Sequence, residues 1–224
     1  MYIAIKDKNT TYLGVSNADV IMDTNPKDMI LDENLNMWRI AGRKGWYAVC
    51  GRYYVESDLL RYSKGLFDKE ITYQSLLSYT IPKIKEILEA RGLVKDRCWY
   101  NDLLLVSKDK AYIIDGYFCV NEVTDFAVAD AREDIIRGSV EFNKDMPIRK
   151  RICEAFHSVD AMRGKRHFPA LVLDIATGKK ECWWSYEDAL EKVQGQEGDI
   201  KKSKESGSKK VLITQAQFDE IFHG

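Results

Sequence analysis

Two short hairpins decide the fold of this chain. The first reads Tyr2-Ile-Ala-Ile-Lys-Asp-Lys-Asn-Thr-Thr-Tyr-Leu-Gly-Val-Ser16, and the second reads Met37-Trp-Arg-Ile-Ala-Gly-Arg-Lys-Gly-Trp-Tyr-Ala-Val-Cys50. Each places strand-forming residues on both sides of a polar or glycine-containing turn, which is the pattern of antiparallel pairing. The sequence therefore predicts two hairpins, followed at Gly51 by a junction and then by a helix from Ser57 to Leu66.

The remaining chain repeats this alternation of hairpins and helix pairs. Thr72 can cap a second helix, which Pro82 should kink or split before Gly92 ends it. Further strands are predicted at 102–107, 110–115, 118–126, 167–175 and 180–185, and helices at about 131–142 and from Asp145 to Val159. Tight turns join antiparallel strands, so a parallel doubly wound sheet is excluded. We predict an α+β fold, a four-layer αββα sandwich with two antiparallel sheets between helix layers.

The length of 224 residues fits one domain, with a core at about 2–185 and a C-terminal extension at 186–224. The extension should begin with a short helix near 186–193. A polar stretch at 195–210 should be a solvated loop, and a strand at 211–214 and a last helix should close the chain.

Composition excludes several classes of protein. The net charge of −1 gives no reason to expect nucleic-acid or membrane binding, and no apolar run approaches the length of a membrane span. The five cysteines are widely spaced, which favours reduced thiols in the cytoplasm. Cys153 and His157 lie four residues apart on a predicted helix, but no further Cys/His pair completes a metal site. We expect no cofactor and no metal.

The order and spacing of these elements resemble the proteasome beta-type and HslV-like subunits of the N-terminal-nucleophile hydrolase superfamily. The resemblance covers about residues 2–185. Besides the two hairpins it includes Ala111-Tyr-Ile-Ile-Asp-Gly116, the helix from Ile148 to Asp160, and Ala170-Leu-Val-Leu-Asp-Ile-Ala-Thr-Gly178.

The resemblance implies a set of catalytic positions. An N-terminal Thr, Ser or Cys would be the nucleophile and its own amine the base, while a lysine and a backbone N–H stabilise charge. Gly51 matches the glycine that supplies this N–H, and Asp160 matches a supporting aspartate. Asn36 occupies the lysine position, and Asp130-Ala131-Arg132 replaces a Gly-Ser-Gly loop.

The nucleophile position falls on or near Met1, and removal of Met1 would expose Tyr2, which cannot act as this nucleophile. The prediction is therefore a pseudoenzyme, a structural or ligand-binding subunit. It should self-associate as a ring or a dimer, and a different protein is a possible partner.

Two alternatives stay open. Cleavage before Thr10 or Thr11 would expose a nucleophile and restore a peptidase or amidohydrolase, although β-branched residues are ordinary in a strand. An unrelated binding or regulatory protein would instead use a remodelled pocket near Gly51 and Asp130, with Arg132 as a further ligand-binding candidate.

Overall fold

The computed structural model describes residues 2–8, 10–16, 37–50, 54–129, 133–163 and 168–205 of the chain. Two five-stranded antiparallel sheets form its centre. The first sheet has the order β10-β1-β2-β11-β12, with β1 (Tyr2–Lys6), β2 (Thr11–Ser16), β10 (Phe126–Ala129), β11 (Ala170–Asp174) and β12 (Lys180–Trp183). The second has the order β3-β4-β7-β8-β9, with β3 (Met37–Arg39), β4 (Tyr47–Cys50), β7 (Leu103–Val106), β8 (Ala111–Ile114) and β9 (Val120–Glu122).

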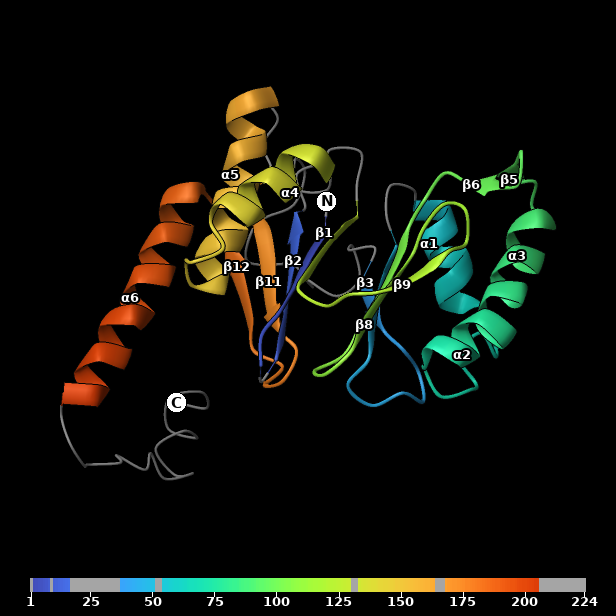
Figure 1. Ribbon diagram of the computed structural model, residues 1–224, viewed down its shortest axis with the longest axis horizontal. Coiled ribbons are helices and arrows are strands. Elements are labelled where there is room, and N and C mark those ends of the chain that lie inside the picture. The colour runs from blue at the N-terminus through green and yellow to red at the C-terminus, as the bar shows by residue number, and fades with distance from the viewer. Residues whose placement is uncertain are drawn as a thin grey trace, which may run out of the picture.

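Helices cover the outer face of each sheet, so the predicted αββα sandwich is confirmed (Figure 1). The first sheet carries α4 (Glu133–Phe142), α5 (Ile148–Arg163) and, outermost, α6 (Tyr186–Glu205). The second carries α1 (Tyr54–Tyr62), α2 (Tyr73–Ser75) and α3 (Ile81–Glu89), with a small hairpin of β5 (Val94–Lys95) and β6 (Cys98–Trp99) at its margin.

Apolar side chains fill the space between the two sheets. Ala4 and Leu13 of the first sheet and Val49 and Leu104 of the second are fully buried in one cluster. Packing of the inner faces of two sheets is the expected way to bury alternate strand residues.

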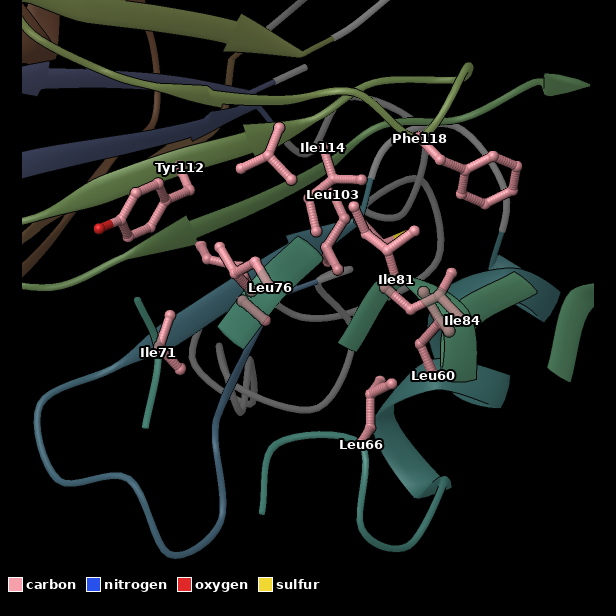
Figure 2. Packing of buried hydrophobic residues seen from close by; sticks show 14 of the residues in the cluster. Leu60, Leu66, Ile71, Leu76, Ile81, Ile84, Leu103, Tyr112, Ile114 and Phe118 are labelled. Carbon is pink, nitrogen blue, oxygen red and sulfur yellow. The ribbon is translucent and has the colours of Figure 1, made fainter. Parts of the chain in front are cut away.

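A second cluster joins the other sheet to α1–α3, as Figure 2 shows for Leu76 and Ile84 beneath Leu103 and Ile114. The side chain of Thr72 caps α2 in a reciprocal capping box with Ser75, as predicted. A π-helical turn at Leu76–Thr80 leads into α3, whose first turn holds Pro82. The hydrogen-bond pattern of this helical stretch therefore changes from π to α next to Pro82, which has no N–H.

Gly14 lets α5 approach the first sheet closely. A Cβ atom at this position would lie 2.6 Å from Cγ2 of Ile152 and 3.2 Å from the ring of Phe156. Glycine weakens a strand, and here it makes room for a helix.

Four sequence predictions differ from the structure. The first helix runs from Tyr54 to Tyr62 and not from Ser57 to Leu66, and Ser57 is buried within α1 instead of capping it. The predicted strand at 118–126 is divided between β9 and β10, which belong to different sheets. The helix predicted to start at Asp145 is α5, and it begins at Ile148, just after the expected cap region.

The fourth difference concerns the polar stretch at 195–210. Residues up to Glu205 continue α6, so the prediction of a loop is wrong there. Gln, Glu and Lys are good helix formers, which polarity alone does not reveal. Residues 206–224, including the predicted strand and last helix, lie outside the described residues.

Candidate functional site

The strand ends that the resemblance associates with catalysis lie at one end of the sandwich. Tyr2 begins β1 and pairs with Val15 on one side and Ala129 on the other. In the second sheet, Cys50 ends β4 and pairs with Leu103. We call this the Tyr2 end and define it by Tyr2, Cys50 and Ala129.

A contact between the two sheets shows which of their ends lie together. The hydroxyl of Thr11 donates a hydrogen bond of 3.2 Å to the carbonyl of Lys108, in the turn between β7 and β8. That turn follows Val106, which pairs with Tyr47 at the start of β4. Thr11 and Tyr47 therefore mark the opposite end, and Tyr2 lies at the same end as Cys50.

Four candidate residues fall outside the described part of the chain: Gly51, Asn36, Asp130 and Arg132. Their described neighbours are all at the Tyr2 end. Cys50 precedes Gly51, Met37 follows Asn36 and pairs with Val49, and Ala129 precedes Asp130. The functions assigned to these four residues remain predictions.

Asp160 belongs to the same end. The first turn of α5 places Arg149 beside Tyr12 and Val172, and Ile152 and Phe156 then lie over Gly14. Asp160 follows Phe156 by about one turn, so the helix carries it past Gly14 toward Ser16 and Tyr2. The order of residues along α5 agrees with a position near the Tyr2 end, as the resemblance expects.

Tyr2 itself is a packing residue. Only 6% of its surface is exposed, and it belongs to the cluster between the two sheets. A bulky aromatic group therefore lies next to Met1, on or near which the resemblance predicts the nucleophile position.

Thr10 lies at the other end of the first sheet, in a hydrogen-bonded pin between two turns. Its hydroxyl donates to Oδ1 of Asp174 at 2.6 Å and accepts from the backbone N–H of Ala176 at 3.1 Å. Oδ2 of Asp174 accepts from the hydroxyl of Thr177 at 2.8 Å. Figure 1 shows the β1–β2 and β11–β12 turns side by side at the lower edge. We call this group, Thr10, Asp174, Ala176 and Thr177, the turn pin.

The turn pin favours the ionised form of Asp174. Burial raises the pKa of this carboxyl, but hydrogen bonds from Thr10, Thr177 and two backbone N–H groups outweigh burial and lower it below its usual range. A group of this kind fixes the position of a turn and holds its threonine hydroxyl in a hydrogen bond.

The structure does not bring Thr10 or Thr11 to the Tyr2 end. In the β1–β2 ladder Thr11 faces Lys6, whereas Tyr2 faces Val15, four residues farther along. Four strand residues span about 13 Å. Both threonines are buried, and both hydroxyls have partners at their own end.

A cavity of about 210 Å³ lies beside the turn pin, between Tyr12, Arg149 and Lys179. Glu181 forms ion pairs with both cations there, with Lys179 at 3.1 Å. Burial and then the charge of Asp174 raise the pKa of Tyr12, so its phenol stays protonated. The charges of this cavity are mutually paired.

Cys50, Cys153 and His157 are packing residues. Cys50 and Cys153 are fully buried, and burial raises the pKa of the Cys153 thiol to about 12. His157 stacks on Tyr186 at 3.7 Å between ring centroids. Within this part of the chain no group of three or more His, Cys, Asp or Glu residues is arranged to hold a metal. Its helices also include none that is long and apolar enough to cross a bilayer.

Sequence reasoning missed a buried carboxylate near the Tyr2 end. Glu56 of α1 is 6% exposed and accepts a hydrogen bond of 2.5 Å from the amide nitrogen of Asn101. Asn101 lies two residues before Leu103, the partner of Cys50, so this bond ties α1 to the start of β7 beside the strand-to-helix junction. In the sequence, an acidic residue two positions into a helix indicates only a favourable contact with the helix dipole.

Solved structures identify this arrangement. Anbu, the ancestral beta-subunit from Yersinia bercovieri, superposes with a TM-score of 0.59 at 11% identity, covering 95% of this chain and 100% of Anbu. The chain has the proteasome-like N-terminal-nucleophile fold. Thiobacillus denitrificans BPH bound to epoxomicin gives a TM-score of 0.58 at 9% identity over 78% of this chain and 98% of BPH.

Eukaryotic HslV from Trypanosoma brucei shares the same proteasome-like fold, with a TM-score of 0.52 at 12% identity over 77% of this chain and 98% of HslV. The sequence matches no protein-family model and no curated protein. The likeness therefore lies in the fold, and the functional positions have to be judged from this chain's own residues.

Proposed function

We propose that this protein is a non-catalytic subunit with a proteasome-like fold, which acts structurally within an assembly of its own copies. The solved structures support the fold. The residues at the Tyr2 end support the absence of threonine-peptidase chemistry, and the outer helices support the self-association.

The observation that carries the proposal is the buried ring of Tyr2. Nucleophilic catalysis of this type needs a small hydroxyl or thiol beside a free amine at the start of β1. Tyr2 presents neither group, and its ring is packed between the sheets with 6% of its surface exposed. In sequence, Asn36 stands where a lysine would lower the barrier.

The threonine hydroxyls do not offer a substitute. Thr10 is bonded to Asp174 and Ala176, and Thr11 to Lys108, at the end of the sheets opposite Cys50. Cleavage before Thr10 would also separate β1, a central strand of its sheet, from the chain that follows.

Self-association is supported by apolar side chains on the α4–α5 layer. Phe142 is 88% exposed and Met162 is 69% exposed, on a layer whose other face covers the first sheet. Aromatic residues and methionine are enriched at the contacts between subunits.

Epoxomicin, which BPH binds, provides a direct test of catalysis. Untagged protein is incubated with epoxomicin and with fluorogenic peptides, and its intact mass is measured before and after. We expect an unchanged mass that includes residues 1–11 and no peptide turnover, while an active threonine peptidase in parallel shows both signals. A mass that begins at Thr10 or Thr11, or turnover that epoxomicin blocks, would overturn the proposal.

Light scattering tests the assembly. We expect a discrete multiple of the 25.9 kDa chain, and Phe142→Asp should shift it toward the monomer. Tyr117→Asp is the matched control, because Tyr117 is 71% exposed in the turn between β8 and β9, away from α4. A monomeric wild-type protein would refute the structural role.

A further inference from the structure

A groove of about 570 Å³ runs between the β3–β4 hairpin and the C-terminal end of α1 with the segment that follows it. Buried apolar side chains of both elements form its floor, including Trp38, Ile40, Leu60 and Leu66. Figure 2 shows Leu60 and Leu66 close together. The volume lies within the range of ligand-binding sites in proteins.

One side of the groove is an edge strand. Within the described residues β3 pairs only with β4. The N–H of Ile40 bonds to the carbonyl of Trp46, so the ladder uses the backbone groups of Ile40 and, two residues earlier, Trp38. Because ladder bonds alternate along an antiparallel pair, the backbone N–H and C=O of Arg39 face away from β4, along the groove.

The rim of the groove is basic. Arg39, Arg61 and Lys64 line it together with a single carboxylate, Asp68. None of the three cations forms an ion pair with a described residue. The guanidinium groups of Arg39 and Arg61 instead lie over the rings of Tyr47 and Tyr62, at 5.6 and 5.4 Å from the ring centroids.

The wall opposite β3 is held in place by side chains from two neighbouring elements. Gly65 adopts a φ of +77° and its carbonyl accepts from the hydroxyl of Tyr79 at 3.1 Å and from Nζ of Lys83 at 3.0 Å. Arg43 donates to the carbonyl of Phe67 at 2.9 Å and to that of Asp68. A wall fixed in this way lowers the ordering cost of binding.

We propose that this groove binds an extended acidic peptide segment of a partner protein, which adds to the edge of β3 as a further strand. Backbone hydrogen bonds to Arg39 would give affinity, and carboxylates at alternate positions, on the side of the peptide that faces α1, would meet Arg61 and Lys64. The exposed ring of Tyr62 offers an apolar contact at the rim. The inference does not depend on whether the chain is catalytic.

Nucleic acid is the other polyanion that a basic, aromatic groove attracts. The exposed strand edge favours a peptide, because it presents N–H and C=O groups in the alternation that a β-strand matches. An oligonucleotide that binds this groove more tightly than an acidic peptide would overturn the proposal.

The test measures fluorescence anisotropy with the full chain and a labelled ten-residue peptide that alternates Glu with Val or Thr. We expect binding that weakens as salt is added, and none with a peptide that carries Lys for Glu. A central proline in the acidic peptide should also abolish binding, since proline breaks strand pairing. Equal binding of the proline peptide would contradict strand addition.

Two charge-reversed proteins of equal net charge locate the contact. Arg61→Glu with Lys64→Glu should weaken binding about tenfold or more, because two favourable rim contacts become repulsive. Arg91→Glu with Lys95→Glu, two exposed cations at the far end of α3, should bind like wild type. Similar losses of affinity in both variants would show that overall charge attracts the peptide, and would refute binding in the groove.

Zero-length cross-linking identifies the occupant. A carbodiimide joins the amine of Lys64 to a carboxylate in contact with it, and the protein is a mixture of ordinary and isotope-labelled chains. Cross-links from Lys64 to the added peptide support the proposal. Cross-links that the peptide does not displace, to a second copy or to acidic residues of the same chain, would overturn it.

Discussion

The two ends of the first sheet carry opposite kinds of residues. At the turn pin, Thr10, Asp174 and Thr177 form a connected hydrogen-bond group between two loops that are far apart in sequence. At the Tyr2 end, the first strand residue is a buried aromatic ring with neighbours from both sheets. A threonine hydroxyl beside an aspartate is therefore found at the end opposite to the one where the resemblance predicts a nucleophile.

This difference shows why residue types alone mislead. A threonine with a nearby aspartate resembles a nucleophile and its support, yet in the turn pin the hydroxyl is occupied by Asp174 and Ala176 and closes a loop. Function depends on where a group lies in the fold and on what its lone pairs and protons already contact.

Of the variants that test this difference between the two ends, the one that removes the ring of Tyr2 should lose the most stability. Tyr2→Ala deletes a buried aromatic group and should lower the free energy of unfolding by about 3 kcal/mol. Urea denaturation measures the change. Tyr100→Ala, at a ring that is 60% exposed, should cost much less. A Tyr2 variant as stable as wild type would mean that this end is not a packed core.

Asp174→Ala tests the opposite end. The variant removes the carboxylate that accepts hydrogen bonds from the hydroxyls of Thr10 and Thr177. Hydrogen bonds to a charged group contribute about 1.5–3 kcal/mol, and partial exposure places Asp174 near the lower value. Asp109→Ala in the β7–β8 turn is the control for loss of a carboxylate. If the two variants lose equal stability, the pin is not structural.

Thr10→Val keeps the shape of the side chain and removes only the hydroxyl. We expect a loss of about 1 kcal/mol in urea denaturation, since two hydrogen bonds are lost at a site close to water. Thr124→Val, at an exposed turn position, should change little. Peptidase turnover should be absent before and after the change. Any turnover that Thr10→Val removes would instead make Thr10 catalytic.

The smallest expected effect is the dependence of the Asp174 contribution to stability on pH. Asp174 has a lowered pKa in the folded protein, so its contribution is fully present above its unfolded pKa of about 3.9 and is lost as pH falls through the lower folded value. The stability gap between wild type and Asp174→Asn should be constant at neutral pH and narrow below about pH 4. A stability gap that widens in acid would contradict the prediction.

The sheets were predictable because their signals are local. Alternation and the Asp7-Lys8 and Gly42–Gly45 turns define each hairpin within a few residues. The start of α1 was not, because burial of Glu56 and Ser57 depends on Asn101 and on the sheet beneath them. Polar residues at 195–205 resembled a loop, and only intrinsic helix propensity argues otherwise.

The candidate site was predictable only in outline. Order and spacing placed Asp160 and the neighbours of Gly51 and Asp130 at one end, because they follow the topology of the sheets. The contact of Thr10 with Asp174 joins residues 164 positions apart and has no local signature. The groove beside β3 likewise arises where a hairpin meets the end of a helix, so its lining is not contiguous in sequence.

The absence of a side chain at Gly14 has a consequence for hydrogen exchange. Ile152 and Phe156 rest directly on the backbone of β2, whose residue 14 lies between Ile3 and Val172 in the ladder. Heavy water can reach those amides only after α5 lifts away, which exposes the whole outer face of the sheet. Strands β1, β2 and β11 should therefore open together with α5, as one cooperative unit that exchanges last.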